Sequence, residues 1–258
     1  MVVETFSVGD ARTRVLILGE GSPLLYLHGF ERHPGEASFL TRLAAGRKVF
    51  APEYPGWGES TGLESIHDVL DQTMFLRQLV EQFNVGPVDV VGHCLGGMFA
   101  AELAALCPQL VRKVVLIDAY GLWLDDHQVP DPFVLNDRDL KAAKWHNIEL
   151  APATEPSFGD DTSPDASIAA LGRIQNLGSA TKFMWPIPDR GLHKRLGLIK
   201  APALVIHGAS DGLVPAIYAA EFGRRIPGAK VTVMESAGHV PMLECEDAFV
   251  SAVNGFLA

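Results

Sequence analysis

The chain of 258 residues has only three cysteines, no long apolar run and no excess of basic charge. Three scattered cysteines cannot form a disulfide framework, so we expect a reduced, cytoplasmic protein. No apolar stretch approaches the roughly 20 residues of a membrane span. A secretory signal has a basic segment followed by an apolar one, and the first residues show neither. A formal net charge of −10 argues against nucleic-acid and anionic-membrane partners.

Short β-rich runs alternate with helical segments along most of the chain. Two alternating runs, Val2–Val8 and Thr13–Leu18, are typical of half-exposed antiparallel strands. Six runs are more continuously apolar, as strands of a buried parallel sheet are: Pro23–Leu27, Val49–Ala51, Val88–Val91, Lys113–Ile117, Ala203–His207 and Lys230–Met234. Helices are predicted between strands and at the end of the chain, over Ser65–Asn84, Leu95–Cys107, Ala216–Ile226 and Cys245–Leu257. The first of these is predicted to begin in a capping box at Ser65–Asp68. The order predicts a doubly wound, mostly parallel α/β sheet of eight strands.

The alternation breaks between Leu122 and His193, where prolines are frequent and only weak helical patches occur. Long segments without β structure of their own are commonly lids or binding loops. We therefore predict one α/β core, residues 1–121 and 193–258, with residues 122–192 inserted as a helical cap. Because binding pockets are lined mainly by apolar and aromatic side chains, Met184, Trp185 and Val240 are the candidate pocket walls.

The segment Gly92-His-Cys94-Leu-Gly96 follows a predicted strand and opens a predicted helix. This is the nucleophile-elbow pattern G-x-S-x-G, with cysteine in place of serine. Its glycines leave room for a tight turn in which a Cβ would clash. A side chain there lies at the positive end of a helix dipole, which favours the thiolate over the thiol. We predict that Cys94 is the nucleophile and that Cys107 and Cys245 are ordinary small apolar residues.

A nucleophile of this kind needs a base, and the base needs an acid to orient it. Asp211 and His239 each follow a predicted strand, at the edge where open α/β sheets build their sites. Asp118 also follows a strand and is a rival acid. We favour Asp211 because its strand directly precedes that of the histidine, in the order nucleophile, acid, histidine.

The third requirement is a pair of hydrogen-bond donors for the oxyanion that forms during acyl transfer. In this architecture one donor follows the nucleophile and the other lies in the loop after an early strand. Those N–H groups belong to Leu95 and Phe30. The histidines show no spacing typical of a metal site, and we expect neither a metal nor another cofactor.

Taken together, these segments make the chain similar to the α/β-hydrolase superfamily over nearly its whole length. The resemblance rests on His28–Phe30, Pro55–Ser60, Gly92–Gly97, Gly208–Asp211 and Gly238–His239. The capped core is similar to that of ring-cleavage-product hydrolases, small-ester hydrolases and lactonases, which normally have serine as the nucleophile. The elbow with cysteine is similar to that of dienelactone hydrolases, which use a Cys-His-Asp triad but lack such a cap.

In dienelactone hydrolases a glutamate of the oxyanion loop can pair with the resting thiol. Glu31 and Glu36 are the corresponding candidates in this chain. The simpler interpretation of both is a solvated loop charge.

The resemblance implies a hydrolase that cleaves an activated ester, lactone or thioester of a small molecule through a thioester on Cys94. One alternative is a hydrolase of C–C bonds in ring-fission products, in which Arg32 or Arg190 would hold a substrate carboxylate. Another is an engineered serine-to-cysteine replacement in a serine esterase. A hydrolase-fold receptor is the alternative of a different class, but an intact triad argues against it. The sequence is compatible with either a monomer or a homodimer as the oligomeric state.

Overall fold

The structure is a computed structural model that describes residues 1–151 and 164–258. Its centre is a sheet of eight strands in the order β1-β2-β4-β3-β5-β6-β7-β8. The first two neighbour pairs, β1 with β2 and β2 with β4, are antiparallel, and all other pairs are parallel. The predicted doubly wound, mostly parallel sheet is confirmed. The strands are β1 (Val2–Val8), β2 (Ala11–Leu18), β3 (Ser22–Leu27), β4 (Arg47–Pro52), β5 (Val88–His93), β6 (Val111–Ile117), β7 (Ala203–Gly208) and β8 (Lys230–Met234).

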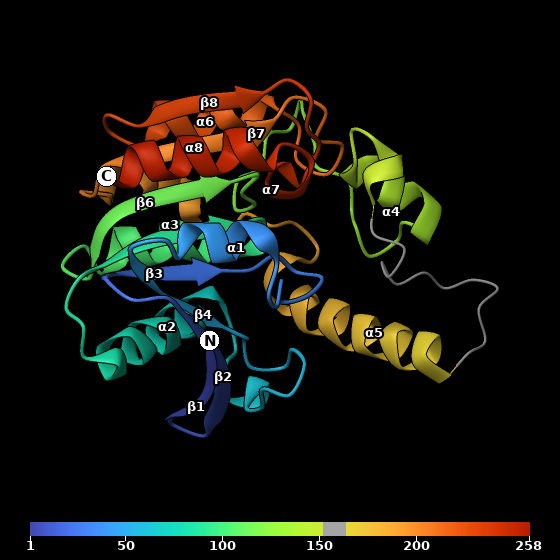
Figure 1. Cartoon of the computed structure of the whole chain (residues 1–258). Helices are drawn as coiled ribbons and strands as arrows, with labels where there is room; N and C mark the ends of the chain where they lie inside the picture. The colour runs from blue at the N-terminus through green and yellow to red at the C-terminus, as the bar shows by residue number, and fades with distance from the viewer. Residues whose placement is uncertain (152–163) are drawn as a thin grey trace.

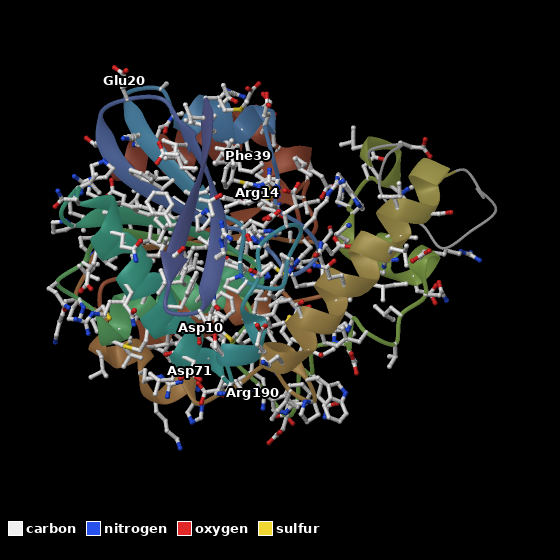
Figure 2. All side chains as sticks on the ribbon, turned by 90° about the horizontal axis from the view of Figure 1, so that it is seen from below. Asp10, Arg14, Glu20, Phe39, Asp71 and Arg190 are labelled. Atoms are coloured by element: carbon white, nitrogen blue, oxygen red, sulfur yellow. The ribbon has the colours of Figure 1, made fainter. Side chains whose placement is uncertain are left out.

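Each face of the sheet carries its own hydrophobic core. Successive strand residues point to opposite faces, so Val90 and Val114 join one core while Val91 and Val115 join the other. The first core packs against α2 (Val69–Phe83), α3 (Leu95–Leu106) and α6 (Ile217–Arg225), and the second against α1 (Ser38–Leu43) and α8 (Glu246–Leu257) (Figure 1). Phe39 of α1 accordingly lies inside the molecule, whereas Glu20 projects from a loop at its edge (Figure 2).

Helix α2 begins later than its sequence suggests. Its cap is Asp68, whose side chain accepts a hydrogen bond of 2.9 Å from the N–H of Asp71. Ser65 belongs instead to the short helix η1 (Leu63–Ser65). The predicted start in a capping box at Ser65 is therefore wrong, because Asp68 satisfies the free N–H of the first turn.

Two α-helices of the described residues lie between β6 and β7, in the region predicted to be a cap. Helices α4 (Asp137–Lys144) and α5 (Pro164–Met184) stand at the edge where the parallel strands end (Figure 1). The second half of α5 is fastened to the core, because Lys182 Nζ donates to the carbonyls of Leu63 and Ile66 at 2.8 and 2.6 Å. Residues 152–163 lie outside the described part, and the boundaries at 122 and 192 stay a prediction.

The remaining helices are short. They are η2 (Ile148–Leu150), η3 (Leu192–Lys194), η4 (Leu196–Leu198) and α7 (Pro241–Glu244). Over residues 1–151 and 164–258, no helix combines the length and the apolar character that crossing a membrane requires.

Candidate active site

Cys94 forms the sharp turn between β5 and α3. Its backbone has φ 59° and ψ −120°, a conformation that residues other than glycine rarely adopt. Such strain costs about 1–3 kcal/mol and persists where the surroundings impose it. Here the Cys94 N–H donates to the carbonyl of Ile117 at 2.8 Å, and the Cys94 carbonyl accepts from the N–H of Tyr120 at 3.2 Å. The end of β6 and the residues after it thus hold the strained turn in place.

Two glycines of the elbow allow the nucleophile to approach the predicted oxyanion loop. A Cβ on Gly92 would lie 2.2 Å from the Gly96 carbonyl oxygen, and one on Gly96 would lie 2.3 Å from that of Leu27. No side chain fits at either distance, so only glycine lets the start of α3 press against the end of β3. This contact places Cys94 beside the loop that follows β3.

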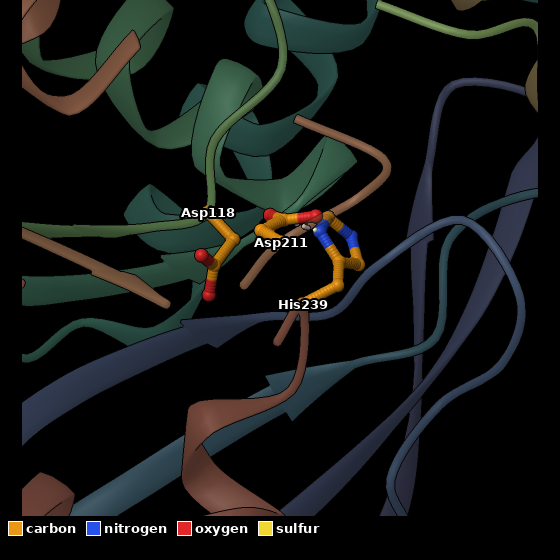
Figure 3. A group of neighbouring side chains, drawn as sticks. All are labelled: Asp118, Asp211 and His239. Atoms are coloured by element: carbon orange, nitrogen blue, oxygen red, sulfur yellow. Dashed lines mark hydrogen bonds and ion pairs between the residues drawn. The ribbon is translucent and has the colours of Figure 1, made fainter. Parts of the chain in front are cut away.

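His239 and Asp211 form a buried hydrogen-bonded pair at the ends of neighbouring strands. His239 Nδ1 donates to Asp211 Oδ2 at 2.8 Å (Figure 3). The other Asp211 oxygen accepts from the N–H groups of Leu213 and Val214 at 2.8 and 2.9 Å. His239 Nε2 is buried and makes no hydrogen bond to the described residues. The aspartate therefore fixes the tautomer in which Nε2 can take a proton.

The charges of this pair support one another. Burial disfavours a charged imidazole, but the Asp211 carboxylate and the Cys94 sulfur outweigh burial and raise the pKa of His239 well above its ordinary value. Burial also disfavours the Asp211 carboxylate, yet His239 and His207 keep the pKa of Asp211 below its ordinary value. Asp211 is thus ionised at neutral pH, and His239 is a stronger base than a free imidazole.

Asp118 lies beside the pair but does not orient the histidine. Its Oδ1 accepts from the N–H of Gly208 at 2.8 Å, and its side chain is fully buried. Burial and the neighbouring Asp211 charge raise the pKa of Asp118 well above its ordinary value. Both causes disfavour the charged form of the Asp118 carboxyl. In this geometry Asp211, and not the rival acid, holds His239 (Figure 3).

Asp118, Asp211 and His239 are close enough together to be candidate metal ligands. Candidate ligand atoms of Asp118, Asp211 and His239 lie within 4.8 Å of one another. However, both Asp211 oxygens and His239 Nδ1 are already used in hydrogen bonds. A proton-transfer pair therefore describes these three side chains better than a metal site.

Two further histidines support the site without acting as bases. His28 Nδ1 donates to the Gly29 carbonyl at 2.7 Å, and the His28 carbonyl accepts from the Tyr54 hydroxyl at 3.0 Å. His93 Nε2 donates to the carbonyl of His239 at 2.7 Å. Burial lowers the pKa of His28 far below its ordinary value and that of His93 to about 3. Both are neutral, and they tie the oxyanion loop and the elbow to their neighbours.

The two predicted oxyanion donors belong to the loop after β3, which contains Phe30, and to the first residue of α3, Leu95. The N–H groups of Phe30 and Leu95 donate to no residue of the described ranges. Trp57 Nε1 donates to the Phe30 carbonyl at 2.8 Å, and this hydrogen bond helps to fix the loop. Two free N–H groups on rigid backbone are what an oxyanion hole requires.

A cavity of about 460 Å³ opens beside Cys94 and His239. Val240 lines it, as expected of a pocket wall, but Met184 and Trp185 are not among its lining residues. Met184 packs in the hydrophobic core and Trp185 is 57% exposed. The reason is that α5 continues to Met184, so the last turn of the helix carries Met184 into the core. The cap residues in the wall are instead Lys144, Trp145, Gly172, Arg173 and Asn176.

The charged residues of the oxyanion loop also differ from expectation. Glu31 is not a solvated charge and is not paired with the thiol, because it binds Lys144 Nζ at 2.6 Å. Glu36 is exposed. Arg32 lines the cavity, whereas Arg190 donates to the carbonyls of Phe183 and Trp185. Sequence reasoning missed the pair of Glu31 and Lys144, since its members lie far apart in the chain.

Comparison with known proteins decides the family. Residues 24–252 match the alpha/beta hydrolase family. The chain belongs to the alpha/beta hydrolase family. One relative, 2-hydroxy-6-oxo-2,4-heptadienoate hydrolase of Pseudomonas putida, is 23% identical over 273 aligned positions that cover 97% of this chain and 94% of that protein. Another, Lipase 1 of Psychrobacter immobilis, is 25% identical over 240 positions that cover 88% of this chain and 74% of that protein.

Solved structures of the family share the fold. A meta-cleavage product hydrolase from Pseudomonas fluorescens superimposes with a TM-score of 0.78 at 19% identity, covering 98% of this chain and 97% of the other. A bromoperoxidase from Bacillus anthracis superimposes with a TM-score of 0.81 at 22% identity, covering 99% of both chains. The alpha/beta hydrolase fold therefore covers nearly all of the chain, and proteins that share it are named for different activities.

Proposed function

We propose that this alpha/beta hydrolase cleaves an activated ester, lactone or thioester by covalent catalysis at Cys94. The observation that carries the proposal is the arrangement around the strained elbow. Cys94, the Asp211-held base His239 and Phe30 line one cavity, and the N–H groups of Phe30 and Leu95 donate to no residue of the described ranges. The lipase among the relatives supports ester bonds as the target.

The first half of the reaction transfers the acyl group to sulfur. The Cys94 thiolate attacks the carbonyl carbon, a C–S bond forms, and the carbonyl electrons move to oxygen. The N–H groups of Phe30 and Leu95 stabilise that oxyanion. When it collapses, the bond to the leaving oxygen or sulfur breaks. The proton held by His239 Nε2 then goes to the departing group.

The second half releases the acid. His239, neutral again, takes a proton from a water molecule, which attacks the thioester carbonyl from the cavity. The tetrahedral intermediate uses the same two N–H donors, and the C–S bond breaks. The thiol is regenerated, and the products are one carboxylic acid and the leaving alcohol, enol or thiol.

The thiol restricts the substrates to those with a good leaving group. A tetrahedral intermediate on sulfur expels whichever group leaves more easily, and a thiolate leaves more easily than an alkoxide or an amide nitrogen. Aryl esters, enol esters and enol lactones, and thioesters can compete with Cys94 as leaving groups. Simple alkyl esters and amides return to starting material instead.

A second candidate is C–C bond hydrolysis of an acidic ring-fission product. The specific observation in its favour is the pair of buried cations, Lys144 and Arg173, in the cavity wall. Cationic side chains suit a substrate carboxylate, and the Pseudomonas putida relative is named for a dienoate substrate.

The test is a substrate panel with two variants of the nucleophile. The panel holds an aryl ester, an enol lactone, an alkyl thioester and a vinylogous diketone with a terminal carboxylate. We expect kcat/KM to be highest for the aryl ester or the lactone, and Cys94→Ala to lower it by at least about 1,000-fold.

Each other outcome points to a different account. Fastest turnover of the diketone acid would favour the second candidate. A Cys94→Ser variant that outperforms the unaltered protein would mean that the scaffold is built for serine. Tight binding without turnover of any substrate would indicate a receptor.

A further inference from the structure

The end of helix α4 touches all three loops on which the proposed chemistry depends. The carbonyl of Ala143 accepts from the N–H of Gly212, next to Asp211, at 2.8 Å. The carbonyl of Lys144 accepts from the N–H of His239 at 2.7 Å. Lys144 Nζ donates to Glu31 Oε2, beside the oxyanion donor Phe30, at 2.6 Å. One helical turn of the inserted region thus contacts the acid loop, the base loop and the oxyanion loop.

Glycines make these approaches possible. A Cβ on Gly238 would lie 2.4 Å from the Lys144 carbonyl oxygen, and one on Gly212 would lie 2.9 Å from that of Ala143. Both obstacles are backbone atoms, which cannot swing aside as a flexible side chain does. The acid and base loops are therefore shaped to receive the end of α4.

The ion pair between Lys144 and Glu31 is largely withdrawn from water. The exposed fractions of the two side chains are 7% and 24%. Burial lowers the pKa of Lys144, although Glu31 opposes this shift. An ion pair at such a position loses hydration that its attraction barely offsets, so it is weak evidence for stability. The presence of this ion pair is better explained by the position that it imposes on the oxyanion loop.

Helix α5 holds the same loop from a second direction. Asn176 Nδ2 donates to the Glu31 carbonyl at 2.5 Å, and Arg173 Nε lies 3.9 Å from Glu31 Oε1. Glu31 is therefore fixed through both its backbone and its side chain. Since Phe30 directly precedes it, the direction of the Phe30 N–H depends on these contacts.

We propose that Lys144 is a positioning residue for the oxyanion hole. Its side chain holds Glu31, and thereby Phe30, while its carbonyl holds the backbone of His239. The oxyanion donor and the base are thus aligned through one residue of the inserted region. This inference rests on the proposed function, because it assigns Lys144 a part in the reaction at Cys94.

The experiment is a double-mutant cycle in the full chain. Lys144→Met keeps the backbone contacts of the residue and most of the length of its side chain but removes the charge, and Glu31→Gln keeps the shape of the other partner. With an aryl ester we expect each single variant to lower kcat about 10- to 100-fold with little change in KM. The double variant is expected to be no worse than either single one, because all three variants lose the contact between Lys144 and Glu31.

Two further variants complete the design. Arg138→Met removes an exposed cation from the same helix and is expected to leave kcat unchanged. Lys144→Arg restores the charge and is expected to recover part of kcat. Thermal unfolding of every variant checks that the protein is folded, and the double variant leaves no unpaired charge of this pair.

Three results would overturn the inference. A raised KM at unchanged kcat in Lys144→Met would show that Lys144 binds substrate directly. Multiplied losses in the double variant would show that the two residues act independently. Unchanged kcat in both single variants would show that their contact is not needed. If Cys94→Ala stays fully active, the proposed function itself fails, and that result is independent of the Lys144 series.

Discussion

At the scale of single residues, the site is defined by what each side chain has already bound. Asp211 uses one oxygen for two N–H groups and the other for His239, so its orientation is fixed before substrate arrives. His239 keeps one buried nitrogen without a hydrogen-bond partner in the described structure. An unsatisfied buried polar atom is costly, and it is tolerated where the reaction uses it.

Replacing Asp211 should therefore abolish activity without removing the hydrogen bonds around it. In Asp211→Asn the amide oxygen can still accept from Leu213 and Val214, but the amide nitrogen now faces His239. It donates to Nδ1 and forces the proton onto Nε2, the wrong tautomer for a base. We expect kcat/KM for an aryl ester to fall by about 1,000-fold or more.

The matched control is Asp118→Asn, which changes the neighbouring carboxyl in the same way. Asp118 accepts from the N–H of Gly208 through one oxygen, a role that an uncharged amide can fill, and its raised pKa favours the uncharged form. We expect its activity to stay within about threefold of the unaltered protein. A larger loss in Asp118→Asn than in Asp211→Asn would assign the acid to the other position.

The sequence allowed the triad to be predicted but not the residues that hold it. Cys94, Asp211 and His239 each follow a recognisable strand, and the parallel sheet brings strand ends together. Lys144 and Glu31 are separated by 113 positions and belong to no local motif. Their contact depends on how α4 packs against the core, which periodicity and spacing do not encode.

At the scale of secondary-structure elements, the close approach of α3 to β3 is the critical contact. A methyl group on Gly96 would meet the carbonyl oxygens of Leu27 and His28 at 2.3 and 2.5 Å. Gly255, in α8, has no neighbour within 4 Å of the position of its Cβ. Substitution of Gly96 therefore tests a steric requirement, whereas substitution of Gly255 tests helix propensity alone.

Alanine should have opposite effects at these two positions. We expect Gly96→Ala to separate the elbow from the oxyanion loop, with a loss of several kcal/mol of unfolding free energy and of ester turnover. We expect Gly255→Ala to raise the unfolding free energy by about 0.5–1 kcal/mol, because alanine favours the helix. Urea unfolding of both variants measures this, and a harmless Gly96→Ala would refute the packing argument.

Element ends were harder to predict than element identities. The strands and long helices follow from apolar patterns that tertiary packing reinforces. The start of α2 depended on which of two polar residues satisfies a free N–H, and the structure uses Asp68. Helix α5 runs to Met184, and its last turn places Met184 in the core rather than in the cavity wall.

At the scale of the whole molecule, two cores flank one sheet, and the site follows the ends of β5, β7 and β8, on the side of the sheet where α4 and α5 stand (Figure 1). The core could be predicted because its strands and helices each carry their own pattern. The cavity could not, since its wall combines the oxyanion loop, α4 and α5, which only the folded chain brings together.

Buried neutral histidines make the stability of the molecule sensitive to acid. His33 donates through Nε2 to the Ala51 carbonyl and accepts through Nδ1 from the N–H of Gly35, both at 3.0 Å. Burial lowers the pKa of His33 from 6.5 to about 4. Between those values the unfolded chain binds more protons at His33 than the folded one, so stability falls as the pH falls.

Replacing His33 should therefore flatten the acid limb of the stability curve. We expect the unfolding free energy of His33→Gln to depend on pH less steeply than that of the unaltered protein between pH 6.5 and 4. The difference in slope is up to about 1.4 kcal/mol per pH unit. Urea unfolding at several pH values measures it. Above pH 7.5 the two curves should run parallel, and equal slopes below pH 6 would contradict the account.

The measurement that tests the central claim most directly is intact-mass spectrometry of the protein mixed with an aryl ester whose acyl group is released slowly. The account predicts a transient mass increase equal to one acyl group, located on the peptide that contains Cys94 and removed by neutral hydroxylamine as a thioester is. The same experiment with Cys94→Ala should show no adduct. Turnover of the ester without an adduct on Cys94, or with an adduct on another residue, would contradict the assignment of Cys94 as the nucleophile.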